Sequence, residues 1–200
     1  MREKADSDLV RRQNRLLLLE ALRQHGPSAR VELGRHTGLS PASITSISSQ
    51  LITDGILEET GPTHAEGPLR RGRPLTQIDI NPKSAHVVAV KLSIDGIELV
   101  LADGRGSILA RRTSRTATYD AEPQAFGRLV ADEITALLAK ARIQARRVAR
   151  IGIAVQGVAD SQAGTVVWSP AFRTRNIGVS TAIEAQLGIP CRVANDANMI

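Results

Sequence analysis

The sequence predicts two folds in one chain: an N-terminal α+β domain of three helices and two strands, and a C-terminal α/β domain with a mixed sheet. Between residues 10 and 80, three stretches with helical spacing of apolar residues precede two strand-like stretches joined by an arginine-rich loop. Further on, three consecutive strand patterns lead into alternating helix and strand patterns, which is typical of layered α/β folds. The turn-forming residues 81–84 separate the two parts, so we assign the domains to residues 1–82 and 83–200.

The first two helices are predicted from apolar spacing and from the residues that end them. The stretch 10–24 is followed by His25-Gly26-Pro27, which stops a helix. Ser28 is placed to cap a second, short helix that ends at Thr37-Gly38, where glycine permits a tight turn. The residues expected to face the core are Leu16, Leu19 and Leu22 in the first helix and Val31 and Leu33 in the second.

A third helix is predicted to begin at Ser40-Pro41, because serine is a good N-cap and proline suits the first helical position. Its stripe of Ile44, Ile47 and Leu51 is expected to pack inward. The other faces carry short side chains, and a helix of this kind, held by a tight turn after another helix, fits the major groove of DNA. The candidate DNA contacts on this helix are Ser40, Ala42, Ser43, Thr45, Ser46 and Ser49.

Two strands and a basic loop follow the third helix. Residues 56–59 and 75–80 have strand patterns, and the loop 61–74 between them is rich in glycine, proline and arginine. A compact cationic loop can enter a narrow minor groove. The candidate DNA contacts in this loop are Arg70, Arg71 and Arg73.

Each feature of this domain, taken alone, also allows an interpretation that does not involve DNA. A three-helix bundle with a polar third helix can be a protein-interaction domain, and an arginine-rich loop can be a solvated surface. The order of helix, helix-turn-helix, strand, basic loop and strand favours a winged helix-turn-helix that binds double-stranded DNA.

The composition is compatible with this interpretation. Hydrophobic residues make up 42% of the 200 residues and aromatic residues 2%, so we expect cores of Leu, Ile, Val and Ala. The net charge of +6, with its excess in arginine, suits either a polyanionic partner or an arginine-rich soluble surface.

The single Cys191 can form neither an internal disulfide nor a zinc site by itself, and the charged residues 1–8 precede a leucine run too short for a signal peptide or membrane span. We therefore expect a cytoplasmic protein without a metal or cofactor.

The C-terminal domain is predicted to hold a three-stranded meander followed by helix, strand, helix and strand. The expected strands are 86–92, 96–102, 107–113, 148–155 and 191–194, and the expected helices are 126–141 and 180–187.

Motifs in both domains resemble those of the ROK (repressor, open reading frame, kinase) family. Residues 28–40 and 51–59 resemble the DNA-binding domain of its regulators, and residues 70–74 resemble its wing. Residues 151–158 resemble the strand and turn before the sugar site, and residues 194–198, Ala-Asn-Asp-Ala-Asn, resemble the sugar-site motif. The resemblance implies a winged helix-turn-helix followed by the first lobe of an actin-like, ribonuclease-H-like domain, with sugar bound between two lobes.

The resemblance also implies that Asn195 and Asp196 are sugar ligands, and an amide beside a carboxylate suits vicinal hydroxyls. An Asn-Asp pair at a strand end equally suits capping of the following helix, and the two roles are compatible. The family usually has proline where this chain has Gln156.

No catalytic residue is assigned. Kinases of the family end their first strand in an aspartate and a Gly-Gly-Thr turn, where this chain has Lys91 to Gly96 with a branched Ile94 in the turn. Asp196, which matches the family's catalytic base, is present, but the phosphate-binding turn is not, which argues against phosphoryl transfer.

The leading hypothesis is a repressor that binds operator DNA and, in its complete form, releases it when a sugar or sugar phosphate binds. The alternatives are a sugar kinase with a DNA-binding head and an adaptor that does not bind DNA. Members of the family carry about as much chain again after the Asn-Asp motif, with a second lobe and a Cys-rich zinc site, whereas this sequence stops at Ile200. We therefore expect an incomplete chain whose complete form is a homo-oligomer.

Overall fold

The computed structural model describes residues 2–61 and 75–199. The chain divides into two compact units, Met1–Ser84 and Ala85–Ile200, here called unit 1 and unit 2. The sequence-based boundary was placed after Pro82, inside the short turn that ends unit 1. Each unit has its own hydrophobic core, and each is described by itself.

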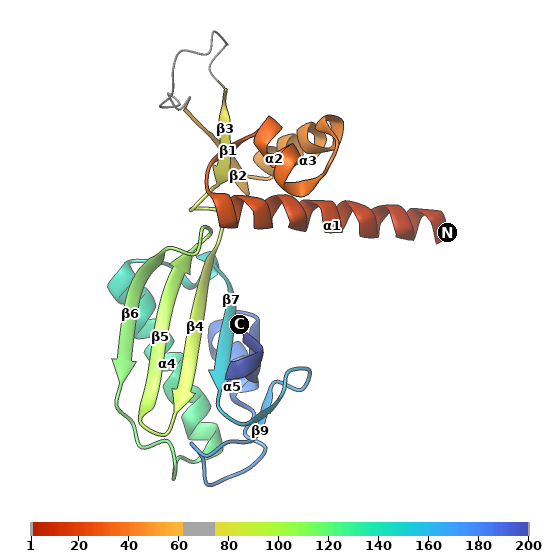
Figure 1. The fold of residues 1–200 in the computed structure, drawn as a ribbon. Helices are drawn as coiled ribbons and strands as arrows, with labels where there is room; N and C mark the ends of the chain where they lie inside the picture. The colour runs from red at the N-terminus through yellow and green to blue at the C-terminus, as the bar shows by residue number, and fades with distance from the viewer. Residues whose placement is uncertain (1, 62–74, 200) are drawn as a thin grey trace. The chain divides into compact units, whose positions relative to one another are not determined.

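Unit 1 consists of three helices and a small antiparallel sheet (Figure 1). Its strands lie in the order β1-β3-β2, with Ser28 opposite Ile78 and Thr60 opposite Gln77. The two-residue strand β1 was not expected from the sequence. The elements of unit 1 are α1 (Arg2–His25), β1 (Ser28–Ala29), α2 (Arg30–Thr37), α3 (Pro41–Thr53), β2 (Leu57–Thr60) and β3 (Gln77–Ile80).

The core of unit 1 lies among its three helices and β3. Leu22 and Leu33 are buried as expected, but Leu16 is 58% exposed and Val31 is 57% exposed. The buried face of α1 is instead formed by Leu18, Ala21 and Leu22, which share one side of the helix at spacings of three and four. A run of four leucines allows several helical registers, and packing against α2 and α3 selects one of them.

The cap of α2 also differs from the expectation. Ser28 belongs to β1 and its hydroxyl donates to the Gly26 carbonyl at 3.0 Å, so it does not cap the helix. The residue before the first helical turn is Ala29, whose backbone N–H donates to the Glu32 carboxylate at 2.8 Å. The Glu32 carboxylate thus satisfies the N–H of the cap residue, whereas a serine N-cap would have accepted from an N–H inside the first turn.

Unit 2 has a five-stranded mixed sheet in the order β10-β7-β4-β5-β6, and α4 and α5 pack together on one face of it (Figure 1). β4 pairs in parallel with β7 and β7 with β10, while β4, β5 and β6 form an antiparallel meander. The elements of unit 2 are β4 (His86–Ser93), β5 (Gly96–Asp103), β6 (Ile108–Ser114), α4 (Pro123–Ala141), η1 (Ala145–Arg147), β7 (Val148–Val155), β8 (Val158–Asp160), β9 (Thr165–Trp168), α5 (Val179–Leu187), β10 (Cys191–Asn195) and η2 (Asp196–Met199).

The fold class predicted for both parts is confirmed, and the small hairpin of β8 and β9 is an addition that the sequence did not indicate. In β4 the buried Val88, Val90 and Leu92 alternate with exposed residues, so one side of the sheet meets α4 and α5. Phe126 of α4 packs edge-on against Phe172 with ring centroids 4.9 Å apart. No helix in the described part of the chain has the length and hydropathy needed to cross a bilayer.

Candidate functional site

The turn between α2 and α3 sets the position of α3. Gly38 adopts φ 71°, and its N–H donates to the Gly34 carbonyl at 3.0 Å, which ends α2 in a left-handed turn. The Thr37 hydroxyl donates to the Leu33 carbonyl at 2.6 Å, and the Leu39 N–H donates to that hydroxyl at 3.3 Å. These contacts fix two short helices in a tight helix-turn-helix.

The start of α3 is held by its cap. Ser40 accepts a hydrogen bond from the Ser43 N–H at 3.2 Å, and Pro41 occupies the first turn, as the sequence predicts. The Ser40 and Ser43 hydroxyls also lie 2.9 Å apart. The Ser43 side chain is half-buried, and its hydroxyl already contacts the Ser40 side chain that caps the helix.

One face of α3 is exposed and carries small side chains. Ile44 and Leu51 are fully buried on the opposite side of the helix. The Thr45 hydroxyl donates to the Pro41 carbonyl at 2.8 Å, whereas within the described part of the chain the Ser46 and Ser49 hydroxyls have no partner in the protein. The exposed face, called the α3 outer face below, consists of Ala42, Thr45, Ser46 and Ser49.

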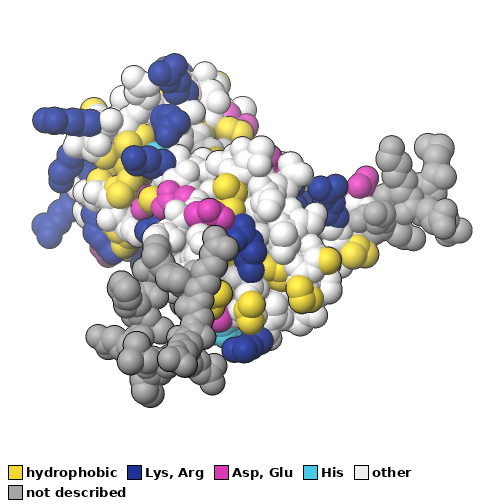
Figure 2. Space-filling view, turned by 90° about the horizontal axis from the view of Figure 1, so that it is seen from above, with side chains coloured by type: hydrophobic (Ala, Val, Ile, Leu, Met, Phe, Trp, Pro, Cys, Tyr) yellow, Lys and Arg dark blue, Asp and Glu magenta, His cyan; other side chains and the backbone are white. Residues whose placement is uncertain are grey.

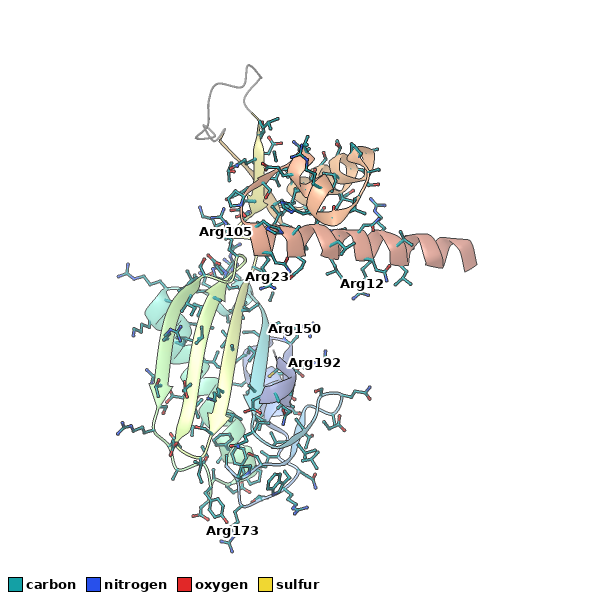
Figure 3. The ribbon with its side chains drawn as sticks, in the orientation of Figure 1. Arg12, Arg23, Arg105, Arg150, Arg173 and Arg192 are labelled. Atoms are coloured by element: carbon teal, nitrogen blue, oxygen red, sulfur yellow. The ribbon has the colours of Figure 1, made fainter. Side chains whose placement is uncertain are left out.

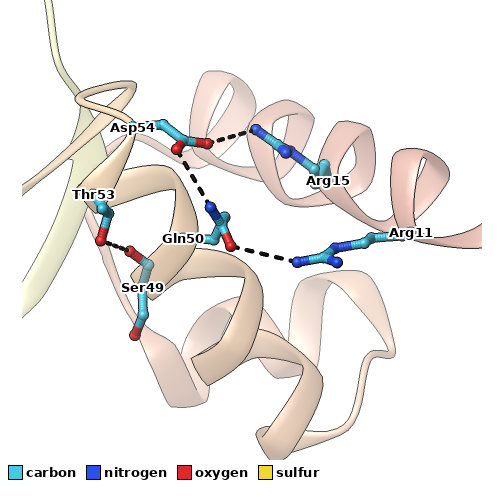
Figure 4. Close-up of polar contacts among 6 residues, drawn as sticks. All are labelled: Arg11, Arg15, Ser49, Gln50, Thr53 and Asp54. Carbon is cyan, nitrogen blue, oxygen red and sulfur yellow. Dashed lines mark hydrogen bonds and ion pairs between the residues drawn. The ribbon is translucent and has the colours of Figure 1, made fainter. Parts of the chain in front are cut away.

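A polar network connects α1 to the end of α3 (Figure 4). Arg11 donates to the Gln50 side-chain oxygen at 3.4 Å, and Gln50 donates to Asp54 at 3.4 Å. Arg15 forms an ion pair with Asp54 at 3.1 Å. Gln50 is exposed next to the α3 outer face and is not among the candidate DNA contacts predicted from the sequence, although its position one residue after Ser49 was a signal for it.

A second contact fixes α3 against the sheet of unit 1. Arg30 donates to the buried Ser48 hydroxyl at 3.2 Å and forms an ion pair with Glu59 of β2 at 3.0 Å. The wing residues Arg70, Arg71 and Arg73 lie outside the described residues. The two strand ends that their loop joins are paired, because Thr60 lies opposite Gln77.

The predicted sugar ligands lie at the end of β10. The Asn195 amide group donates to the Gly157 carbonyl, and its side-chain oxygen accepts from the Ala197 N–H at 2.8 Å. Asp196 accepts from the same N–H at 3.0 Å. Both side chains are half-buried. Asn195 precedes η2 and caps it, so the capping role considered from the sequence is observed for Asn195, whereas Asp196 is the first residue of η2. Asn195 additionally holds the turn after β7.

Gly157 is required by the geometry of that turn. Its φ is +128°, and a Cβ at this position would lie 2.2 Å from the Trp168 carbonyl oxygen. A side chain would therefore clash with β9 as well as strain the backbone. Gln156, the preceding residue, is exposed.

The β4–β5 connection is a two-residue hairpin. Ser93 pairs with Gly96, and Ile94 in the turn is 59% exposed. A Cβ on Gly96 would lie 2.2 Å from the Ser114 carbonyl oxygen, so glycine is needed here because the end of β6 approaches the backbone closely. The buried Thr118 hydroxyl lies 3.0 Å from the Ser93 carbonyl oxygen and 2.9 Å from that of Ala171, which anchors the hairpin.

The described residues contain no cluster of three or more histidine, cysteine, aspartate or glutamate side chains placed to hold a metal ion. Cys191 is half-buried in β10. Burial, and secondly the nearby Glu184 carboxylate, raise the pKa of its thiol to about 12. The thiol is therefore protonated at neutral pH and is a poor nucleophile there.

The chain matches curated transcriptional regulators over nearly its whole length. The chain is 24% identical over 189 residues to the DNA-binding transcriptional dual regulator NagC of Escherichia coli (strain K12), covering 94% of this chain and 45% of NagC. It is 24% identical over 194 residues to the xylose repressor of Bacillus subtilis (strain 168), covering 97% of this chain and 49% of the repressor. The chain thus spans about half the length of the curated relatives it matches.

A solved structure of a ROK family transcriptional regulator, described as a homolog of the E. coli MLC protein, superposes with a TM-score of 0.69 at 25% identity. The superposition covers 94% of this chain and 46% of that chain, and so includes parts of both units. The model of the ROK family matches residues 87–200, more than half of the chain. The family predicted from the motifs is thereby confirmed, and the chain belongs to the ROK family.

Proposed function

We propose that this chain is the DNA-binding part, with the first lobe of the effector-binding part, of a transcriptional repressor that controls carbohydrate genes. The α3 outer face carries the proposal, because it presents unpartnered hydroxyls of Ser46 and Ser49 on a helix fixed by a tight turn. Short side chains there let the helix enter the major groove and reach base edges. The names of the relatives, a xylose repressor and a transcriptional regulator, support this assignment.

The proposed partner is double-stranded operator DNA. The α3 outer face reads bases, and Arg70, Arg71 and Arg73 of the wing contact phosphates or the minor groove, where guanidinium groups pair well. The proposed effector is a sugar or sugar phosphate, with Asn195 and Asp196 as ligands in the complete protein. The complete protein is proposed to be a homo-oligomer, so that it reads an operator with two half-sites.

Catalysis is not part of the proposal. Phosphoryl transfer needs backbone amides close to the nucleotide phosphates. In the β4–β5 hairpin, Ser93 and Gly96 are committed to strand pairing, and the branched Ile94 occupies the turn. The two curated relatives described above are named as a transcriptional regulator and a repressor, which agrees with this choice.

The proposal is tested with the full chain in a selection from randomised DNA duplexes, followed by anisotropy titrations of the selected duplex. We expect a defined consensus sequence. Replacing Arg71 and Arg73 together by alanine should weaken binding to every duplex and lower the slope of log K against log salt by about one to two. Replacing the exposed Arg12 of α1 is the control and should leave the slope unchanged. Absence of any consensus, or equal slopes for wing variant and wild type, would count against the assignment.

A further inference from the structure

Unit 2 carries a basic edge that the proposed function does not use. Five of the chain's 26 lysines and arginines lie in the eleven residues 140–150, and no aspartate or glutamate occurs between Glu133 and Asp160. The five residues, called the basic edge below, are Lys140, Arg142, Arg146, Arg147 and Arg150, and all are exposed.

The basic edge lies at one end of the sheet. It covers the last turn of α4, the 3-10 turn η1 and the start of β7. Because His86 pairs with both Val148 and Asp103, this is the end at which β4 and β7 begin and β5 ends. In Figure 3, Arg105 of the β5–β6 turn and Arg150 lie toward this end, and Arg173 lies at the opposite end of unit 2.

Four of the five charges of the basic edge have no counter-charge among the described residues; Arg147 has a partner and is not one of these four. Arg146 donates to the neutral side chain of Gln144 at 2.8 Å, and within the described residues Lys140, Arg142 and Arg150 form no ion pair. Asp103, at the same end of the sheet, accepts from the backbone N–H groups of Arg105 and Ser107, both at 2.9 Å. Positive charges held close together without counter-charges favour the binding of a polyanion.

The arrangement of the basic edge suits an extended phosphate backbone and not a small anion. The five side chains come from a helix end, a turn and a strand, and they point into solvent with no enclosing wall among the described residues. A repeated phosphate chain can pair with such spread cations, whereas a single small anion would need convergent donors. Figure 2 shows several Lys and Arg side chains that stand out from the surface in view and do not line a hollow.

We propose that the basic edge is a second phosphate-contact surface, which binds the DNA backbone beside the operator without reading sequence. The inference rests on the proposed function, because it takes the DNA to be held by unit 1. The chain enters unit 2 at this same end, and only residues 81–85 separate β3 from β4. DNA bound by unit 1 therefore raises the local concentration of phosphate at this edge.

The test uses the full chain, a fluorescent duplex of the selected sequence and a second duplex of scrambled sequence. The triple variant Arg142→Gln, Arg146→Gln and Arg150→Gln removes three charges of the edge. Its matched control is Arg115→Gln, Arg128→Gln and Arg175→Gln, which removes three exposed charges from the opposite end of unit 2. Both variants change the net charge equally, and neither removes a core side chain.

We expect the edge variant to bind both duplexes about ten-fold more weakly, with a salt slope lower by about one to two, and the control to match wild type. The selected consensus should stay the same. Equal behaviour of the two variants, whether both lose affinity or neither does, would overturn the inference.

The outcome also separates the inference from the proposed function. If the wing variant weakens binding and the edge variant does not, the repressor assignment stands and the basic edge is only a solvated surface. If the edge variant weakens binding while changes on α3 and the wing have no effect, the edge binds DNA but unit 1 does not recognise the operator sequence. A wild-type chain that binds neither duplex would refute both.

Discussion

Arg15 of α1 and Asp54, the residue that caps the end of α3, form an ion pair across 3.1 Å. Both side chains are about one third exposed, so water screens part of the attraction. Arg15→Ala is expected to lower the free energy of unfolding by about 0.5 kcal/mol, measured by urea denaturation. Arg12, labelled in Figure 3, is exposed on the same helix, and Arg12→Ala is the control. Equal losses for the two variants would mean that the pair contributes nothing.

Ser46 should affect sequence preference without affecting stability. Its hydroxyl is exposed and has no partner among the described residues, so Ser46→Ala should leave the unfolding curve unchanged. In a randomised-duplex selection the variant should change discrimination at one base pair by about 1 kcal/mol, with non-specific affinity nearly unaltered.

Ser40 is the matched comparison, because it caps α3 through the Ser43 N–H. Ser40→Ala should lower the free energy of unfolding by about 1 kcal/mol. If Ser46→Ala returns the wild-type consensus at every position, α3 is not the reading helix. Ser43 remains a candidate DNA contact, but its hydroxyl also contacts the capping Ser40. Ser43→Ala would therefore change both stability and sequence preference.

The helix-turn-helix was predictable because its signals are local. A serine before proline, a glycine after a short helix and the stripe of Ile44, Ile47 and Leu51 each act within a few residues. The register of α1 was not predictable, because four consecutive leucines fit several faces and only contacts with α2 and α3 decide among them. Val31 was wrongly placed inside the core for another reason: it is two residues from Leu33, and residues two apart do not share a face of a helix.

The sugar-site motif and its capping role were recognisable from the sequence, but its hydrogen bond to the β7–β8 turn was not. The contact from Asn195 to the Gly157 carbonyl joins residues 38 positions apart, and nothing in either segment alone indicates it. Likewise, the polar network of Arg11, Gln50 and Asp54 depends on how α1 crosses the end of α3, which is a property of packing.

The chain should show no ATP-dependent phosphorylation of sugars. The β4–β5 hairpin is held by the Ser93–Gly96 pair and anchored by Thr118, so it cannot open into a phosphate-binding loop without losing this pairing and the Thr118 hydrogen bond. A coupled assay with glucose, N-acetylglucosamine, mannose and xylose is expected to match a boiled control. Turnover above that control with any of these sugars would contradict the assignment.

Cys191 should resist alkylation in the folded chain. Burial and the Glu184 carboxylate raise the pKa of its thiol to about 12, so little thiolate exists at neutral pH. Its rate with iodoacetamide should keep rising up to high pH, and the chain unfolded in urea should react as a free thiol does. Because the folded pKa exceeds that of the unfolded chain, this residue lowers stability as the pH rises through the interval between them. A plateau of the folded rate near the ordinary thiol pKa would contradict the burial.

Gly157 should be the least replaceable glycine of unit 2 near the sugar-site motif. It combines a φ of +128° with a Cβ position only 2.2 Å from the Trp168 carbonyl oxygen, so Gly157→Ala must shift backbone. We expect a loss of about 2 kcal/mol or more in the free energy of unfolding. Gly152, on the neighbouring strand β7, is the control, because a Cβ there meets nothing within 4 Å. Gly152→Ala should be neutral or slightly stabilising.

The effect of Gly157→Ala should also reach Asn195, whose amide donates to the Gly157 carbonyl. In the amide NMR spectrum, the Asn195 side-chain resonances and the Ala197 N–H should both shift in Gly157→Ala and stay in place in Gly152→Ala, because Asn195 links the β7–β8 turn to the cap of η2. Asn195→Asp removes the donor and keeps an acceptor for Ala197, so it should disturb the turn while leaving η2 capped. If Gly157→Ala left the Asn195 and Ala197 signals unmoved, the turn and the sugar-site motif would be structurally independent.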